Sequence, residues 1–178
     1  MFSASEASVA VITGGSSGIG LNAARALRAR GLKVYELSRR AENAEPGVTH
    51  LQADVTDETQ VNAAVAEILR REGRIDILIN NAGFGACGSF LETDPEKELS
   101  MLRVNVLAMH RLFKFVLKKM EAQGFGAILN VASSAGLLPG GPYMAGYYAS
   151  KAYVVSLTRG VAEELREQHS PVYVCALC

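Results

Sequence analysis

Tyr147 and Lys151 are the two residues of this sequence whose spacing most directly suggests chemistry. They are four residues apart in a segment, residues 147–168, whose apolar spacing predicts a helix, so both side chains are expected on one helix face. A lone tyrosine is a poor base near neutral pH, but a neighbouring ammonium group favours its phenolate form. The pair therefore predicts an acid/base at Tyr147 that gives a proton to a substrate oxygen or takes one from it. Taken alone, such a pair is more often an ordinary surface pair.

The glycine-rich segment of residues 13–20 could hold a phosphate group. It reads T-G-G-S-S-G-I-G and joins a predicted strand, Val9–Thr13, to a helix predicted from about Gly18 to Arg30. Glycine allows positive φ and close approach of a ligand, and the amides of a helix N-terminus carry partial positive charge. Gly20 is expected to let the helix pack tightly. A turn that merely joins strand and helix is the alternative to a pyrophosphate site formed by Gly14, Ser16, Ser17, Gly18 and Ile19.

Two arginines follow the second predicted strand and bear on the choice of cofactor. In dinucleotide-binding folds this position meets the adenosine ribose, and enzymes that use NAD place an acid there. Here Arg39 and Arg40 stand at that place, and arginine pairs bidentately with a phosphate. The sequence therefore favours NADP(H), with NAD(H) as the alternative. Arg39 is interpreted as a ligand of the 2′-phosphate, whereas Arg40 is equally well explained as a solvated loop charge.

The elements that position these residues alternate between strand and helix along the whole chain. Strands are predicted at residues 9–13, 33–38, 48–52, 76–80, 127–132 and 172–177, and helices at 18–30, from Thr56 or Asp57 to 71, at 94–123 and at 147–168. This alternation predicts an α/β fold with a doubly wound parallel sheet in the strand order 3-2-1-4-5-6. Residues 39–47 are short for a crossover, so a stub of helix or an extended loop is expected there, and its role stays open.

Taken together, and in the order in which they occur along the chain, the motifs resemble those of the short-chain dehydrogenase/reductase family. The resemblance covers nearly the whole chain and rests on T-G-x-x-x-G-x-G, on Asn80-Asn81-Ala82-Gly83, on Ser134 and on the Y-x-x-x-K motif of Tyr147 and Lys151. It implies a Rossmann-type single domain, residues 1–178, that binds the cofactor and also carries the catalytic residues. It further implies an oxidoreductase that transfers a hydride between NADP(H) and the carbon of an alcohol or ketone.

The resemblance also implies roles for residues that would be weak signals alone. Ser134 is expected to bind the substrate oxygen, with Ser133 structural, and Lys151 also to bind the nicotinamide ribose. Asn105 is expected to support a water-linked proton path to Lys151, although a simple buried polar role is a serious alternative. The cofactor is expected to meet further residues after the third and fourth strands, namely Asp54, Val55, Asn81, Ala82 and Gly83. For Asp54, capping of the next helix is the competing interpretation.

Composition excludes several other classes of function. The 178 residues carry 18 Lys plus Arg against 18 Asp plus Glu, so no basic excess points to nucleic acid or to an anionic membrane. No apolar run approaches the ~18 residues of a membrane-spanning helix, and a cytoplasmic location is the default expectation. Cys175 and Cys178 form a lone C-x-x-C, interpreted as small apolar residues at the end of a buried strand. The three histidines are interpreted as structural and remote from the chemistry, so no metal is expected.

The resemblance raises two further expectations. Members usually continue past the point that corresponds to Cys178, into a substrate-covering segment and another strand. The chain is therefore expected to be a fragment or a protein without a lid, and a nucleotide-binding module without turnover is the alternative function. Homodimers or homotetramers are expected through the helices at 94–123 and 147–168, where apolar residues could face either core or partner: Met101, Leu112, Phe113 and Val116. Neither the small-molecule substrate nor the direction of reaction follows from the sequence.

Overall fold

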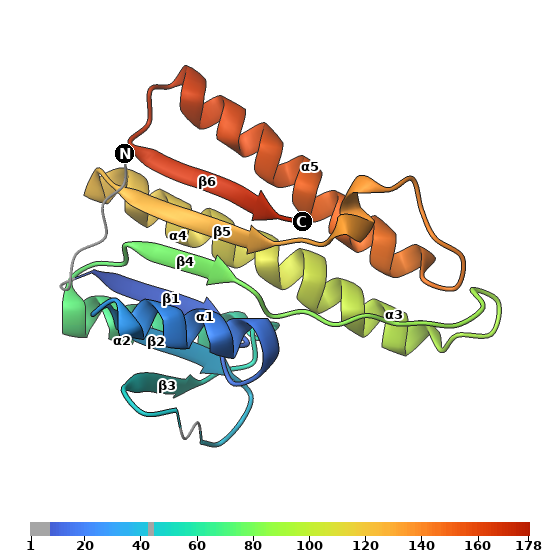
Figure 1. The fold of residues 1–178 in the computed structure, drawn as a ribbon, viewed down its shortest axis with the longest axis horizontal. Coiled ribbons are helices and arrows are strands. Elements are labelled where there is room, and N and C mark those ends of the chain that lie inside the picture. Colours follow the sequence, from blue (N-terminus) through green and yellow to red (C-terminus); the bar gives the residue numbers. More distant parts are fainter. Residues whose placement is uncertain (1–7, 43–44) are drawn as a thin grey trace.

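Six parallel strands form one sheet in the order β3-β2-β1-β4-β5-β6 (Figure 1). The structure is a computed structural model, and it describes residues 8–42 and 45–178. The predicted doubly wound order is thereby confirmed, and it reverses between β1 and β4, where such folds bind ligands. The strands are β1 (Val9–Thr13), β2 (Lys33–Ser38), β3 (Val48–Gln52), β4 (Ile77–Asn80), β5 (Gly126–Val131) and β6 (Val172–Leu177).

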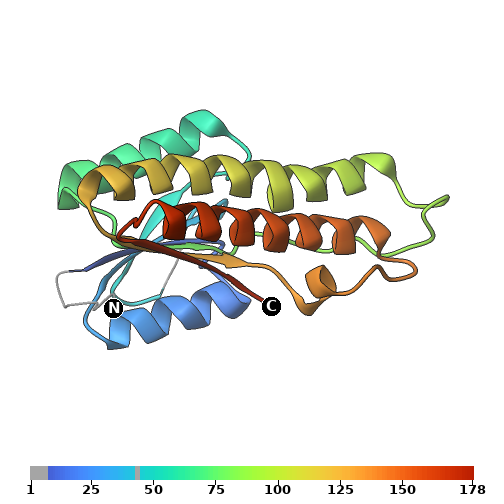
Figure 2. The same cartoon turned by 90° about the horizontal axis from the view of Figure 1, so that it is seen from above.

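Helices cover both faces of the sheet, as Figure 2 shows from above. One face carries α1 (Gly18–Ala29), and the other carries α2 (Glu58–Glu72), α4 (Met109–Gln123) and α5 (Ala145–Glu167). The larger apolar core lies on the second face, and a smaller one lies beneath α1. Within the described parts of the chain, no helix has the length and apolarity needed to cross a bilayer. The residues proposed to face core or partner are all buried and thus belong to this chain's interior: Met101, Leu112, Phe113 and Val116.

Helix ends follow the expected capping chemistry. Asp57, rather than Thr56, caps α2, because its carboxylate accepts hydrogen bonds from the amides of Thr59 (2.9 Å) and Gln60 (3.1 Å). Asp94 caps the helix that begins at Pro95 in the same way. Gly124, with φ +83°, ends α4 in the left-handed conformation that glycine adopts most easily.

The predicted helix at 94–123 is not uniform. It consists of α3 (Pro95–Leu102), a π-helical turn (Arg103–Ala108) and α4, joined without a break. The apolar pattern does not reveal such a turn, because one widened turn shifts the hydrogen bonds without interrupting the helix. A 3-10 helix (Ser134–Leu137) after β5 was also not predicted. Two predicted strands and the last helix are displaced by one or two residues, since β4 starts at Ile77, β5 at Gly126 and α5 at Ala145.

The link between β2 and β3 contains no helix in its described part, residues 39–42 and 45–47. Of the two predicted alternatives, the extended loop is therefore the one observed there, while residues 43–44 lie outside the described residues. Glu45 is joined to Arg25 of α1 by an ion pair of 2.8 Å. The described part of this link therefore adds no helix over β3.

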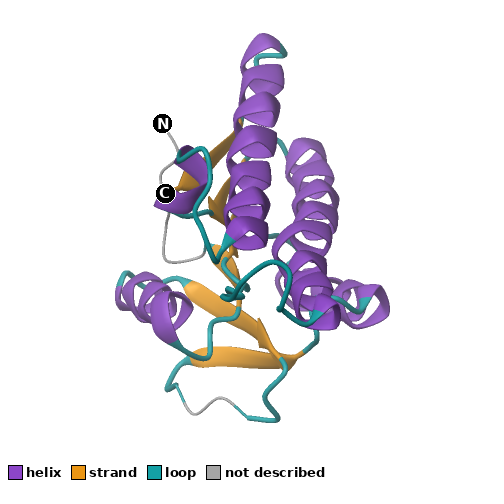
Figure 3. Cartoon of the chain, turned by 90° about the vertical axis from the view of Figure 1, so that its right-hand side faces the viewer, coloured by secondary structure: helices purple, strands orange, loops and turns teal. Residues whose placement is uncertain are grey.

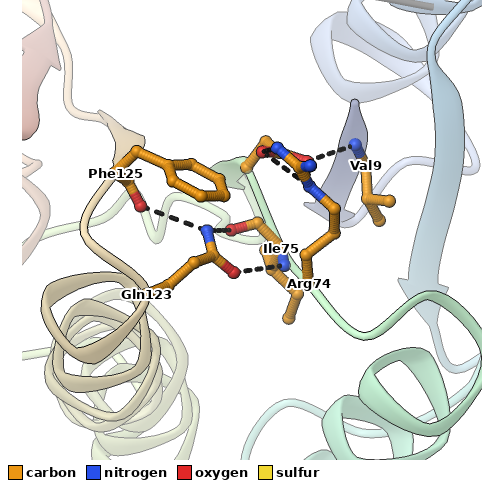
Figure 4. Close-up of polar contacts among 6 residues, drawn as sticks. Val9, Arg74, Ile75, Gln123 and Phe125 are labelled. Atoms are coloured by element: carbon orange, nitrogen blue, oxygen red, sulfur yellow. Dashed lines mark hydrogen bonds and ion pairs between the residues drawn. The ribbon is translucent and has the colours of Figure 1, made fainter. Parts of the chain in front are cut away.

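Polar contacts tie β1 to β4 at the edge of the sheet where both strands begin (Figure 4). The Asp76 carboxylate is 1% exposed and accepts from the Val9 amide at 2.7 Å and from the Arg74 guanidinium. Beside it, the Gln123 side chain accepts from the Ile75 amide (3.3 Å) and donates to the Ile75 carbonyl (3.0 Å). These contacts join the start of β4 to β1, with which Ile77, Leu78 and Ile79 then pair.

Replacing Asp76 with alanine is expected to lower the free energy of unfolding by about 2 kcal/mol, because the buried Val9 amide loses its acceptor. Asp76→Asn keeps an acceptor oxygen and should retain most of the stability. Urea unfolding followed by circular dichroism measures both variants. If the alanine variant were as stable as the asparagine variant, the Val9 contact would contribute nothing measurable.

Candidate active site

The predicted site residues lie where the strands end. Figure 3 looks onto this carboxyl edge, where the loops that carry them cross the front of the sheet. In a parallel sheet this edge gathers residues from distant parts of the sequence. The structure places there, after β1 to β5 in turn, residues 14–19, Arg39 and Arg40, Asp54 and Val55, residues 81–83, and Ser134, while Tyr147 and Lys151 lie in the first turns of α5.

The glycine loop leaves the N-terminus of α1 open. Gly14 (φ +66°) and Gly18 (φ +55°) are left-handed, and a Cβ built on Gly18 would meet nothing within 4 Å. Ser17 stands at the N-cap, but its side chain makes no capping bond, and the first turn holds no acid. The first amides of α1 are thus free to bind an anion, which fits the pyrophosphate of a dinucleotide. Ser17, Gly18 and Ile19 are exposed around this opening.

Asn81 and Thr13 join the glycine loop to the loop after β4. The Asn81 amide group donates to the carbonyls of Thr13 and Gly14, both at 3.1 Å. The Thr13 hydroxyl accepts from the Asn81 and Ala82 amides, both at 3.0 Å. Gly20 is needed for this arrangement, because a Cβ there would lie 2.5 Å from Asn81 Nδ2. Sequence reasoning missed Thr13, although a hydroxyl at the end of β1 was a usable signal.

Asp54 does not cap α2, the role that competed with an adenine contact. Its carboxylate instead accepts from the Thr56 amide (2.9 Å) and hydroxyl (2.7 Å) just before that helix. Burial alone would raise the pKa of Asp54, but the Thr56 hydrogen bonds and the positive charge of Arg39 lower it overall. Arg39, whose charge acts on this carboxylate, and Arg40 are both exposed. The neighbouring Val55 lines a cavity of about 220 Å³ between α2 and α4.

Lys151 is the buried cation of the site. It is 6% exposed, and its Nζ donates to the Val131 carbonyl at 2.9 Å. Nζ lies 5.9 Å from the centroid of the Tyr147 ring, and a Cβ on Gly83 would lie 3.5 Å from it. Burial lowers the pKa of Lys151, because an ammonium group is poorly solvated there. The structure therefore places the cation between the end of β5, the loop after β4 and the phenol.

Tyr147 is half-buried and lies against the loop after β4. A Cβ on Gly85 would lie 3.6 Å from the Tyr147 ring, an ordinary van der Waals distance, so the ring lies beside the backbone of this loop. The ring also lines a small pocket with Ala86, Tyr143 and Met144. Apolar residues and the carboxylate of Glu98 thus line the pocket beside Tyr147, and the Lys151 ammonium lies over its ring.

Ser134 is exposed at the start of the 3-10 helix that follows β5. Ser133 caps that helix by accepting from the Ala135 amide at 3.2 Å, which agrees with the structural role expected for it. The 3-10 helix rests on α5 so closely that a Cβ on Gly136 would lie 2.5 Å from the Lys151 carbonyl oxygen. Ser134 is therefore carried on a segment held directly against the turn that bears Lys151.

Asn105 lies inside the π-helical turn and is 2% exposed. Its side chain accepts from the Phe84 amide (3.1 Å) and donates to the Phe84 carbonyl (2.9 Å) and to the Ser150 hydroxyl (3.2 Å). These bonds match the buried polar role that was the alternative for Asn105. They fasten the loop after β4 to α5, one residue before Lys151, and the expected proton path stays a prediction.

The interpretation of His50 as structural and remote from the chemistry stays a prediction, but the sequence did not reveal its contacts with the loop that bears Arg40. His50 lies on β3, and its ring contacts the Glu36 carboxylate and, at 3.0 Å, the Arg40 carbonyl. The parallel register places Glu36 opposite His50, which periodicity along one strand does not show. The interpretation of Cys175 and Cys178 as residues at the end of a buried strand is wrong. Cys175 is only partly buried and Cys178 is exposed, because β6 is an edge strand of the described sheet. Among residues 8–42 and 45–178, no group of three His, Cys, Asp or Glu side chains could hold a metal.

Comparison with known proteins gives a consistent result. The pattern of the family described as short chain dehydrogenase matches residues 8–178. The chain is 38% identical over 165 residues to a 3-ketodihydrosphingosine reductase of Bacteroides thetaiotaomicron, covering 92% of this chain and 61% of that protein. A short-chain dehydrogenase/reductase of Burkholderia phymatum, solved with NAD, has a TM-score of 0.90 at 32% identity, over 96% of this chain and 64% of that one.

A solved variant of actinorhodin polyketide ketoreductase with NADPH also has a TM-score of 0.90, at 34% identity, over 99% of this chain and 71% of that one. The chain thus spans about three fifths of the length of the Bacteroides relative and about two thirds to seven tenths of the solved structures. The family pattern covers more than nine tenths of the chain, and the fold and strand order agree with it. The chain belongs to the short-chain dehydrogenase/reductase family.

Proposed function

We propose that this protein is an oxidoreductase that transfers a hydride between NADP(H) and the carbon of an alcohol or ketone. The observation that carries the proposal is the buried Lys151 ammonium beside the Tyr147 ring, at the same sheet edge as the open N-terminus of α1. A bound nicotinamide cofactor would supply the hydride chemistry itself. Residues 1–178 would form one domain that holds both the cofactor and the reacting groups.

Each side chain of the site would have its own role in proton transfer. Tyr147 would give its hydroxyl proton to a ketone oxygen, or accept one from an alcohol in the reverse direction. Lys151 would stabilise the phenolate electrostatically and also bind the nicotinamide ribose. Ser134 would donate a hydrogen bond to the substrate oxygen and stabilise the charge that develops there. Asn105 would hold the π-helical turn and the loop after β4 in place, and support a water-linked proton path to Lys151.

The cofactor would lie along the carboxyl edge from the glycine loop to the loop after β4. Amides of residues 14–19 would bind the pyrophosphate, Asp54 and Val55 the adenine, and residues 81–83 the nicotinamide half. Related structures contain NAD in one case and NADPH in another, so the family alone leaves the choice open. The exposed Arg39 and Arg40 at the end of β2 support NADP(H). We also propose a homodimer or homotetramer through α4 and α5.

Titration calorimetry with NADPH and NADH, followed by turnover of a ketone panel, tests the proposal. The panel should include simple ketones, sugars, steroids and 3-ketoacyl thioesters, with cofactor oxidation followed by absorbance. Cofactor-dependent reduction of any member is the expected result. Tight binding of NADPH without oxidation across the panel, in a chain verified as full length, would instead identify a nucleotide-binding module without turnover.

Replacing Arg39 with aspartate is expected to weaken NADPH binding by roughly ten- to a hundredfold, because a cation that pairs with the 2′-phosphate becomes an anion that repels it. NADH lacks that phosphate, and its affinity should change little. The dissociation constants of both cofactors measure the effect. An equal loss for both would remove the reason for choosing NADP(H).

A further inference from the structure

A buried carboxylate lies directly beneath the glycine loop. Glu36, on β2, is 0% exposed, and a Cβ on Gly15 would lie 2.7 Å from Glu36 Cβ. Strands in the middle of a parallel sheet are normally apolar, and a buried carboxylate is costly unless it is paired. The neighbours of Glu36 Oε1 are the His50 ring and the Ser38 hydroxyl at 3.3 Å, whereas Oε2 has no hydrogen-bond partner. The free-energy cost of burying this carboxylate indicates that Glu36 does more than pack against its neighbours.

His50 connects this carboxylate to the loop that bears the two arginines. Its Nδ1 contacts Glu36 Oε1, and its Nε2 lies 3.0 Å from the Arg40 carbonyl oxygen. A carbonyl oxygen only accepts, so Nε2 must carry a hydrogen. The contact between Nδ1 and Glu36 then needs a second proton, on either the ring or the carboxyl group. With that proton in place, Glu36 orients the imidazole so that it donates to Arg40.

A second side chain of β3 holds the adjoining carbonyl. Gln52 Nε2 donates to the Arg39 carbonyl oxygen at 3.2 Å. Two consecutive carbonyls, those of Arg39 and Arg40, are therefore held by alternate residues of one strand, His50 and Gln52. These bonds fix the backbone from which both guanidinium groups project, while the side chains themselves stay exposed. A fixed backbone reduces the conformational freedom that is lost when a ligand binds.

We propose that Glu36 and His50 are positioning residues that hold the Arg39–Arg40 backbone for recognition of the cofactor's 2′-phosphate. The inference rests on the proposed function, since it presumes that NADP(H) is the cofactor. Neither residue reaches the phosphate in this account, because Glu36 lies under Gly15 and His50 faces the Arg40 carbonyl. A pair that only braced β2 against β3 would affect overall stability but would not distinguish NADPH from NADH.

The test compares the dissociation constants of NADPH and NADH, measured by titration calorimetry, for wild type and variants. His50→Leu removes the bond to Arg40 and is expected to weaken NADPH binding on the order of tenfold, with NADH within about twofold. Glu36→Gln should keep the wild-type preference, because its amide can donate to Nδ1 of a neutral imidazole. His110→Leu is the matched control. It removes a histidine of α4 that is hydrogen-bonded to Tyr153 of α5, and it should change neither dissociation constant.

The outcomes separate the inference from the function on which it rests. A wild type without preference for NADPH would overturn the proposed cofactor, and with it this inference, before any substitution is made. A wild type with that preference, combined with equal or absent changes for both cofactors in His50→Leu, would overturn the inference alone. If His50→Leu fails to fold, Glu36→Leu is the second variant, because leucine suits the buried position. An unchanged ratio of the two constants in that variant would overturn the inference equally.

Discussion

Replacing Tyr147 with phenylalanine is expected to lower turnover strongly while leaving cofactor affinity nearly unchanged. The variant removes one hydroxyl group and keeps the ring, which packs beside Gly85 and lines the small pocket with Met144. General acid–base catalysis contributes about 10²- to 10⁴-fold to a rate, so kcat should fall by that factor. The loss should appear in kcat rather than in the dissociation constant of NADPH, because the hydroxyl acts on the reacting oxygen.

Tyr148→Phe is the matched control, because this neighbouring tyrosine is on the same helix but is not four residues before Lys151. Its ring packs against Gly141, where a Cβ would lie 2.7 Å from Tyr148 Cε2. Steady-state turnover and NADPH titration of both variants test the assignment of Tyr147 as the acid/base. Full activity in Tyr147→Phe, or an equal loss in Tyr148→Phe, would show that the acid/base has been misassigned.

The arrangement of the strands was largely accessible from the sequence. Short apolar runs bounded by glycine or polar residues marked β1, β2, β3 and β6 with the bounds that the structure has. Their alternation with helical segments then required a parallel sheet, in which the carboxyl ends of the strands meet. The grouping of the glycine loop, Ser134 and Tyr147 at one edge followed from this rule. The roles of those side chains stay predictions.

Features that depend on hydrogen bonds between distant elements were not accessible in the same way. The π-helical turn around Asn105 leaves the apolar pattern of residues 94–123 intact, and only the bonds from Asn105 to Phe84 and Ser150 reveal what it holds. The contact between Glu36 and His50 depends on the register of β2 against β3. A glutamate inside the apolar run of β2 was nevertheless a visible signal, since buried strands seldom carry an acid.

Lys151→Met is expected to lose turnover by about 10²- to 10⁴-fold and yet to be at least as stable as wild type at pH 7. The cause of the first effect is the loss of the charge beside Tyr147. The cause of the second is burial, which makes the ammonium form of Lys151 unfavourable in the folded chain and lowers its pKa below the ordinary 10.5. Methionine has a similar length and is apolar, so it suits the same space without that penalty.

The sign of the pH dependence follows from this lowered pKa. Below the folded-state pKa of Lys151, both folded and unfolded chains hold the proton, and the burial penalty is fully present. Between that pKa and 10.5, the unfolded chain binds more protons than the folded one, so the wild type gains stability as the pH rises. Lys151→Met should lack this contribution, so its advantage over wild type in thermal unfolding should shrink from pH 7 towards pH 10.

Lys114→Met separates this effect from a general gain in apolarity, because Lys114 is exposed on α4. That control should keep wild-type turnover and follow the wild-type dependence of melting temperature on pH. A Lys151→Met variant that melted well below wild type at pH 7 would show that the bond from Nζ to the Val131 carbonyl outweighs the burial penalty. The main role of Lys151 would then be to stabilise the fold. A stable, inactive variant would instead show that the fold tolerates an unfavourable buried cation because the chemistry beside Tyr147 requires it.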